Sequence, residues 1–105
     1  MSQFDVYINP SKKSREAYPY IIDIQNALIS DIATRIVMPL GRLNHFRNEK
    51  MDGLTPVVEY ENEQFVLLTP QISSMSVKLL TNPVGSVESL RDEIIAAIDF
   101  AITGI

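Results

Sequence analysis

The chain has 105 residues, of which 46% are hydrophobic and 21% are charged, which predicts one folded domain over residues 1–105 with a modest core rather than a disordered chain. The net charge of −4 argues against a protein that binds nucleic acid on its own. Because the chain has no cysteine, disulfides and thiolate metal sites are excluded. Because the first residues lack the pattern of a secretory signal and no apolar run approaches the roughly 20 residues that span a bilayer, we expect a cytoplasmic protein that binds no membrane.

Three strands are predicted in the first part of the chain. Phe4, Val6 and Ile8 alternate with polar positions, which indicates a strand with one buried face. Runs rich in β-branched residues at 20–24 and 34–38 predict two more strands. Since proline cannot donate to a ladder, the second of these runs is expected to end at the proline that follows it.

The connections around these strands are less regular. The segment between the second and third predicted strands carries two neighbouring apolar residues, Leu28 and Ile29, which could belong to the core or form an exposed contact. From the pattern alone the core is favoured. The stretch 41–50 has no clean period, so we expect a loop or a single helical turn there.

The next part of the chain reads as a hairpin and a further strand. Strand-like runs at 57–60 and 64–68 flank the polar residues 61–63, the length of a three-residue hairpin loop. Another apolar run at 77–80 predicts a strand before the turn formers at 82–85. The meander is therefore predicted to be antiparallel.

A helix is predicted at the end of the chain. Ser89 and Asp92 have the spacing of a capping box, which marks a helix start. Apolar residues then recur every three or four positions, as on the buried stripe of an amphipathic helix. They are Leu90, Ile94, Ile95, Ile98, Ala101 and Ile102. Several short strands closed by one helix predict a mainly β fold, a small and partly open barrel.

The residue types needed for catalysis are missing from the pattern. The single histidine, His45, has no second histidine one turn away, which argues against a zinc site. The chain has no Gly-rich phosphate loop and no nucleophile elbow. Glu59, Glu61 and Glu63 have the spacing of a solvated hairpin face. We therefore expect neither an active site nor a cofactor.

One strip of the predicted helix departs from local expectation. Asp92, Ala96, Asp99 and Thr103 fall on one line opposite the apolar stripe. Asp99 and the carboxylate of Ile105 lie at the C-terminal end, where the helix dipole favours cations instead. Positions that break a local rule are candidates for function, although a plain solvent face would show the same spacing.

Blocks along the whole chain resemble one known family. In order, they are Gln3-Phe4-Asp5-Val6-Tyr7, Ile22-Asp23-Ile24-Gln25, Arg35-Ile36-Val37-Met38-Pro39-Leu40, Thr55-Pro56-Val57-Val58, and Asp92-Glu93-Ile94-Ile95-Ala96-Ala97-Ile98-Asp99 with the closing Gly104-Ile105. These blocks are similar to those of the CcdB toxins of toxin–antitoxin systems. Well-known members carry tryptophan before the closing Gly-Ile, where this chain has Thr103.

The resemblance implies a fold, a mechanism and partners. It implies an SH3-like partly open antiparallel barrel with a C-terminal helix, a homodimer, and a plasmid-maintenance toxin that binds the A subunit of DNA gyrase. Such a toxin traps the DNA-cleaved complex without catalysing a reaction. A CcdA-like antitoxin neutralises it, and DNA is contacted, and transcription repressed, only through the complex with the antitoxin.

The resemblance also assigns candidate residues. It places gyrase contacts, by position, at Leu28, Ile29, Asp92, Ala96, Asp99, Thr103, Gly104 and Ile105. It places weaker candidates for antitoxin binding at Arg42 and Phe46. Two alternatives stay open: an inert homologue that binds only the antitoxin, and an endoribonuclease like MazF. The second would need a basic groove, whereas this chain is acidic.

Overall fold

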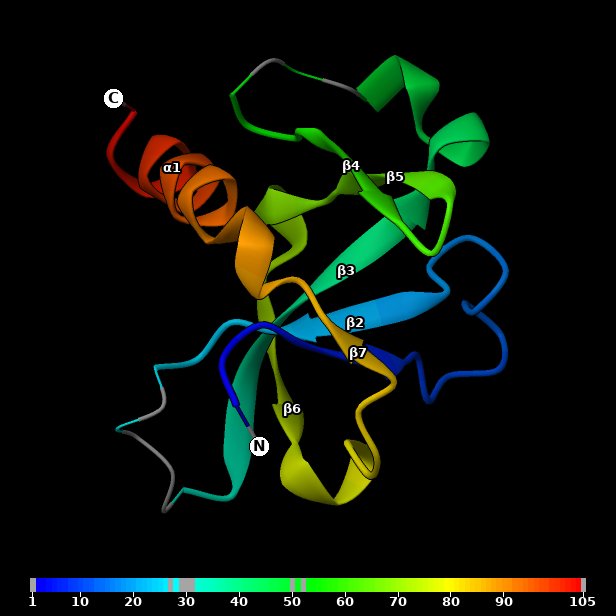
Figure 1. Ribbon diagram of the computed structural model, residues 1–105, viewed down its shortest axis with the longest axis vertical. Helices are drawn as coiled ribbons and strands as arrows, with labels where there is room; N and C mark the ends of the chain where they lie inside the picture. The colour runs from blue at the N-terminus through cyan, green and yellow to red at the C-terminus, as the bar shows by residue number, and fades with distance from the viewer. Residues whose placement is uncertain (1, 27, 29–31, 50, 52, 105) are drawn as a thin grey trace.

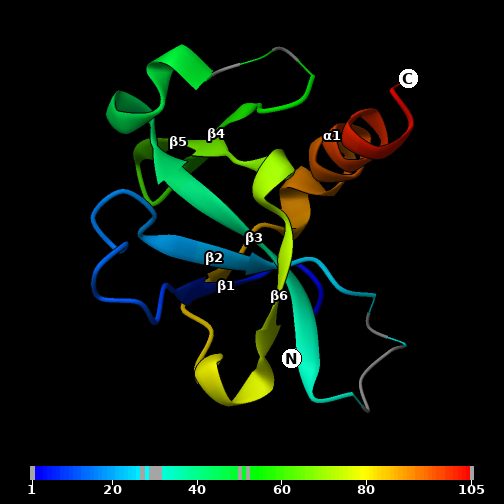
Figure 2. The same ribbon diagram turned by 180° about the vertical axis from the view of Figure 1, so that it is seen from behind.

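The sheet is organised around one long strand, β3 (Thr34–Arg42). The computed structural model describes residues 2–26, 28, 32–49, 51 and 53–104 (Figures 1 and 2). Its strand order is β4-β5-β3-β2-β1-β7, with β6 paired to β3 outside this path, and every pairing is antiparallel. The other strands are β1 (Asp5–Ile8), β2 (Tyr20–Asp23), β4 (Val57–Tyr60), β5 (Glu63–Leu67), β6 (Ser73–Ser76) and β7 (Gly85–Ser86).

One α-helix, α1 (Arg91–Thr103), closes the fold. Short 3-10 turns connect the other elements: η1 (Leu43–His45), η2 (Arg47–Glu49), η3 (Thr69–Gln71), η4 (Val77–Leu79) and η5 (Glu88–Leu90). The sheet curls around the N-terminal part of α1 as half of a barrel (Figure 1). The predicted class, a mainly β curled antiparallel sheet with a C-terminal helix, is confirmed.

Pro39 does not end the third strand as predicted, because β3 continues to Arg42. One edge of β3 pairs with β2, while the other edge pairs first with β6, over 34–37, and then with β5, over 40–42. The Pro39 carbonyl accepts from the Leu68 amide at 3.1 Å, so the backbone polar groups of Pro39 face this second edge. The missing amide therefore falls where the edge changes partner, and no ladder bond is lost.

The main core lies between the sheet and α1. Ile94 and Ala97 of the helix are buried, and Leu90, Ile95 and Ile98 pack beside them. The sheet contributes the buried side chains of Phe4, Val6, Ile22, Ile24, Met38, Leu40, Val58, Tyr60, Phe65 and Leu67. Alternate positions of five strands thus supply one apolar face, which agrees with the period-two pattern.

The opposite face of the sheet is also covered. Tyr7, Ile21, Val37 and Leu80 form a second cluster, and Phe46, Val66 and Leu68 form a third. Because both faces of the sheet are covered, neighbouring side chains of β1 can be buried on opposite faces. Phe4 and Val6 are buried as predicted, but Ile8 is 50% exposed whereas Tyr7 is only 2% exposed. The single buried face that was predicted for this strand is therefore wrong in part.

Two buried tyrosine hydroxyls have no hydrogen-bond partner among the described residues. They belong to Tyr7 and Tyr60. Burial raises the pKa of Tyr7 above its ordinary value of 10.0, and the carboxylates of Asp5 and Asp23 raise it further. Burial likewise raises the pKa of Tyr60, with a contribution from Glu61. Both hydroxyls are thus held in the neutral form.

Three local predictions need correction. The hairpin between β4 and β5 has a two-residue turn, because Tyr60 pairs with Glu63, and Glu61 and Asn62 have φ values of +52° and +63°. This left-handed pair is the primed turn that fits the strand twist. The strand expected at 77–80 lies earlier, as β6, and 77–79 is a 3-10 turn. The irregular stretch 41–50 contains the end of β3 and two such turns.

The helix start also differs from the prediction. The N-cap of α1 is Leu90, without a side-chain cap, and Ser89 lies within η5. The N-cap of η5 is Val87, also without a side-chain cap, and the Ser86 hydroxyl accepts from the Glu88 amide at 3.1 Å in a local turn. The chain enters α1 through η5, which removes the geometry of a capping box. Within the described part of the chain, no helix has the length and apolarity that crossing a membrane requires.

Candidate functional site

The outer face of α1 carries the polar strip that the sequence singled out. Because Ile94 and Ala97 hold the helix against the core, the positions on the opposite side face solvent. Asp92, Ala96, Asp99 and Thr103 are all exposed. The predicted surface strip is therefore confirmed as a surface, and its role in binding stays a prediction.

The C-terminal end of α1 is electronegative. Its last turn contains no basic residue, and the exposed Asp99 lies there beside the terminal carbonyls. Gly104 adopts a φ of +76°, a left-handed cap in which its amide donates to the Phe100 carbonyl at 2.9 Å. The Thr103 hydroxyl donates to the Asp99 carbonyl at 2.6 Å. Ile105 lies outside the described residues.

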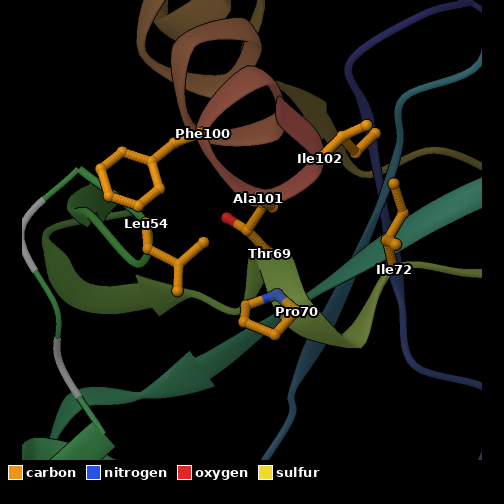
Figure 3. Close-up of a pocket in the computed structure, with 7 residues that line it drawn as sticks. All are labelled: Leu54, Thr69, Pro70, Ile72, Phe100, Ala101 and Ile102. Atoms are coloured by element: carbon orange, nitrogen blue, oxygen red, sulfur yellow. The ribbon is translucent and has the colours of Figure 1, made fainter. Parts of the chain in front are cut away.

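An apolar pocket lies beside this end of the helix (Figure 3). Its volume is about 420 Å³. The lining residues are Leu54, Thr69, Pro70, Ile72, Phe100, Ala101 and Ile102. Ile102 is 74% exposed, so the apolar stripe of α1 continues past the core onto the surface. The predicted stripe is buried at Ile94, and its last two positions, Ala101 and Ile102, are exposed.

A buried hydroxyl lies beneath the pocket surface, on Thr69. Thr69 is 1% exposed, and its hydroxyl has no hydrogen-bond partner among the described residues. In Figure 3 this oxygen faces the space between Phe100 and Leu54. Sequence reasoning missed Leu54, Ile72 and Phe100. The available signal was Phe100, a large apolar residue in the last turns of the helix but off its buried stripe.

Leu28 lies in the connection between β2 and β3. Its side chain is 91% exposed, so the prediction that it belongs to the core is wrong. In both Figures 1 and 2 the described part of the β2–β3 connection is at the opposite end of the molecule from the C-terminal end of α1. One chain therefore keeps this connection apart from the C-terminal end of α1. Ile29 lies outside the described residues.

Arg42 ends β3, and Phe46 directly follows η1. The Arg42 side chain donates to the Glu16 carbonyl at 2.9 Å and forms an ion pair with Glu63. Phe46 is 8% exposed, and its ring centroid is 5.1 Å from that of Tyr18. Arg42 is thus the more accessible of the two, and Phe46 is buried in the cluster with Val66 and Leu68.

Comparison with known families decides the identity of this β-sheet with its terminal helix. A family model described as CcdB protein matches residues 3–104. The chain belongs to the CcdB family. The match covers nearly all of the chain, including the sheet and the helix α1 that carries the polar strip. The resemblance found in the sequence blocks is confirmed, and the chain is a CcdB-type toxin of a toxin–antitoxin system.

Proposed function

We propose that this CcdB-type toxin binds the A subunit of DNA gyrase, traps the DNA-cleaved complex without catalysing a reaction, and is neutralised by a CcdA-like antitoxin. The observation that carries the proposal is the exposed strip of α1, with Asp92, Ala96, Asp99, Thr103 and Gly104 free of the core. Its position matches the gyrase-contacting positions that the family resemblance assigned. Family membership over residues 3–104 supports the same reading.

A poison of this kind works by preferential binding. If the toxin binds the cleaved state of gyrase more tightly than the intact state, mass action raises the population of the cleaved state. No general base, nucleophile or metal is required for that effect. The functional demand on the toxin is a surface of defined shape and charge, and α1 provides one on a rigid element packed against the main core.

The test is a gyrase assay with purified protein. We expect inhibition of supercoiling and accumulation of cleaved DNA that depends on toxin, gyrase and DNA together. The matched control is the variant Glu59→Lys, which changes an exposed carboxylate on β4, away from the helix strip. Gyrase that supercoils normally at saturating toxin, without cleaved DNA, would refute the proposal.

One observation favours a second candidate, an inert homologue that retains only antitoxin binding. Thr103 stands where well-known members carry tryptophan, and its hydroxyl is engaged by the Asp99 carbonyl of its own helix. A threonine in this state cannot stack on a cationic partner side chain as tryptophan can. An expression test in bacteria separates the two candidates: the gyrase poison stops growth, and the inert homologue does not.

The apolar end of α1 supports a homodimer as the functional unit. Ile102, Ile72 and Phe100 are 74%, 38% and 39% exposed around the pocket. Contiguous exposed apolar surface on a small protein marks an interaction site. A two-fold contact would bury this surface with its own copy. Sedimentation at micromolar concentration tests the proposal, and a monomer there would exclude it.

The antitoxin is proposed to bind a second surface, near Arg42 and Phe46. The ion pair of Arg42 with Glu63 leaves both side chains partly exposed, so a partner carboxylate could replace Glu63 there. Binding at two sites of one protein is coupled reciprocally in free energy. An antitoxin peptide that accelerates release of the toxin from a gyrase A fragment would support the coupling, and an unchanged off-rate would exclude it. DNA binding, transcription repression and plasmid maintenance are assigned to the toxin–antitoxin complex.

A further inference from the structure

A buried ion pair joins the two strands that lead into the exposed β2–β3 connection. The Arg35 side chain donates from Nε to Asp23 Oδ2 at 2.8 Å. The two side chains are 2% and 0% exposed, whereas the other ion pair among the described residues, Arg42 with Glu63, is partly exposed on both sides. Asp23 ends β2, and Arg35 is the second residue of β3.

The same carboxylate and guanidinium bind the backbone of Gln25, the second residue beyond the last register pair of β2. Asp23 Oδ1 accepts from the Gln25 backbone amide at 3.0 Å. Arg35 Nη2 lies 3.5 Å from the Gln25 carbonyl oxygen. The Gln25 side chain is itself buried and accepts, through Oε1, from the Ile36 amide at 3.1 Å. Asp23, Gln25, Arg35 and Ile36 are called the stem network below.

The stem network continues the pairing of β2 with β3 after the regular ladder has stopped. The last register pair is Asp23 with Val37, and the Ile24 amide then donates to the Ile36 carbonyl at 3.0 Å. On its other edge this end of β3 is paired with β6, Arg35 being opposite Met75. The start of β3 is thus hydrogen-bonded on both edges, and the stem network holds Gln25 against it.

Asn26 connects the stem network to the exposed Leu28. Asn26 follows Gln25, and its side-chain Oδ1 accepts from the Leu28 amide at 2.8 Å. Because the Leu28 side chain is 91% exposed, packing against the core does not determine its position. The bond from the Leu28 amide to Asn26 is therefore the contact that the structure shows for this leucine, and the peptide bond between Asn26 and Gln25 joins it to the stem network.

Stability does not explain why an ion pair is used here. Removing two charges from water costs several kcal/mol, and buried ion pairs can often be replaced by apolar residues of similar volume without loss of stability. An apolar pair would bury as well beside Tyr7, Ile21 and Val37, the neighbouring cluster. It would not bind the Gln25 amide and carbonyl. The specific contribution of the charges is therefore geometric.

We propose that Asp23 and Arg35 are positioning residues that hold the stem network so that Leu28 is presented to the target already ordered. The proposal rests on the proposed function where it names gyrase as that target. Ordering a contact residue before binding removes part of the entropy cost of association. Loss of the stem network should therefore weaken target binding while the fold survives.

The test replaces both charges at once. The double variant Asp23→Leu with Arg35→Met should fold, with faster hydrogen exchange at the amides of Gln25, Leu28 and Ile36. Its affinity for a gyrase A fragment should fall by about 2- to 13-fold, the range for the entropy cost of ordering one side chain on binding. The matched control is Leu80→Ala, which removes buried apolar volume from the neighbouring cluster without touching the stem network.

Each outcome decides the proposal. Weaker binding and faster stem exchange in the double variant, with native binding in Leu80→Ala, support it. Native binding by a folded double variant overturns it, and so does an equal loss in Leu80→Ala, because global stability would then be the cause. If the native protein itself does not bind the gyrase fragment, the proposed function fails. The positioning role is then decided by hydrogen exchange in the double variant, and unchanged exchange at the amides of Gln25, Leu28 and Ile36 overturns it.

A second variant covers the case in which the double variant does not fold. Arg35→Lys keeps a cation beside Asp23 but lacks the planar fork that reaches both Asp23 and Gln25. It should retain the fold, with faster exchange at the Gln25 amide and a smaller loss of affinity than the double variant. Native exchange and native affinity in Arg35→Lys would overturn the proposal.

Discussion

Charge reversal at the two ends of the helix strip separates binding from stability. Asp99 lies in the last turn of α1 and Asp92 in the first, and both are exposed on the same face. Replacing either by lysine changes the net charge equally. The helix dipole responds oppositely, because its C-terminal end favours a cation and its N-terminal end an anion. The two variants should therefore move thermal stability in opposite directions.

The size of the stability change follows from the dipole. Removing an unfavourable anion and adding a favourable cation each contribute about 0.3–1 kcal/mol, so Asp99→Lys should stabilise by about 0.6–2 kcal/mol. For a domain of this size that is a rise in Tm of about 3–10 °C. Asp92→Lys should lower the Tm by a similar amount. Neither side chain has a hydrogen bond or ion pair among the described interactions of α1 that would offset this.

The effect on gyrase binding should have the same sign in both variants. An acidic strip favours a basic partner surface, so each lysine removes one attraction and adds one repulsion. At about 0.2–1 kcal/mol for each exposed charge contact, the loss is about 0.4–2 kcal/mol, or about 2- to 30-fold in Kd. Asp99→Lys should thus be a more stable but weaker toxin.

Titration calorimetry with a gyrase A fragment and thermal denaturation of the same samples provide the comparison. Glu59→Lys, which carries the same charge change on β4, is the control for non-specific electrostatics. The affinity differences should shrink at high salt, where exposed charges are screened. A native Kd for both helix variants at low salt would refute the assignment of the strip as the gyrase surface.

Three further predictions address the ends of the site and the buried tyrosines. Deletion of residues 103–105 should abolish growth inhibition but lower stability by only about 1–2 kcal/mol, since it removes the Gly104 cap bond and the exposed Thr103 side chain; circular dichroism and a toxicity test check it. Leu28→Glu should weaken gyrase binding about tenfold and change stability by less than about 0.5 kcal/mol, because the side chain is 91% exposed; a folded variant with native affinity would exclude Leu28 from the contact. Because Tyr7 and Tyr60 have raised pKa values in the folded state, the unfolded state loses its phenolic protons first, and stability should fall as pH rises above 10.0. In Tyr7→Phe and Tyr60→Phe the loss of stability at alkaline pH should be smaller, and the phenolate absorbance of the replaced tyrosine, which appears only well above pH 10.0, should be missing. A phenolate titration that is unchanged in both variants would contradict the prediction.

The regular parts of the fold were predictable because their side chains repeat. Alternation located β1, runs rich in β-branched residues located β2 and the start of β3, strand-like runs around a polar turn located β4 and β5, and the three-to-four spacing located α1. The errors arise where tertiary contacts replace local signals. Pro39 is tolerated inside β3 because the strand changes partner there, which no local pattern reveals. Ser89 has the spacing of a cap, but the 3-10 turn η5 occupies its position.

The candidate site was predictable only in the part that lies on one helix. Periodicity identified the strip from Asp92 to Thr103 because a helix brings such positions to one face. The apolar pocket combines Ile72 and Leu54 with the end of α1, and segments so distant in sequence meet only through the sheet topology. The stem network was equally hidden, since a buried Asp23 and Arg35 look like ordinary surface charges in a strand pattern.

The pairing of β1 with β7 has a consequence for how the toxin folds. Asp5 and Val6 pair with Ser86 and Gly85, and the Val87 amide donates to the Phe4 carbonyl at 2.9 Å just before the chain enters α1. Contacts between segments so far apart in sequence form late, because loop closure must be completed first. We therefore expect the helix that carries the candidate target surface to dock late in folding, so that partly folded chains are harmless to the cell.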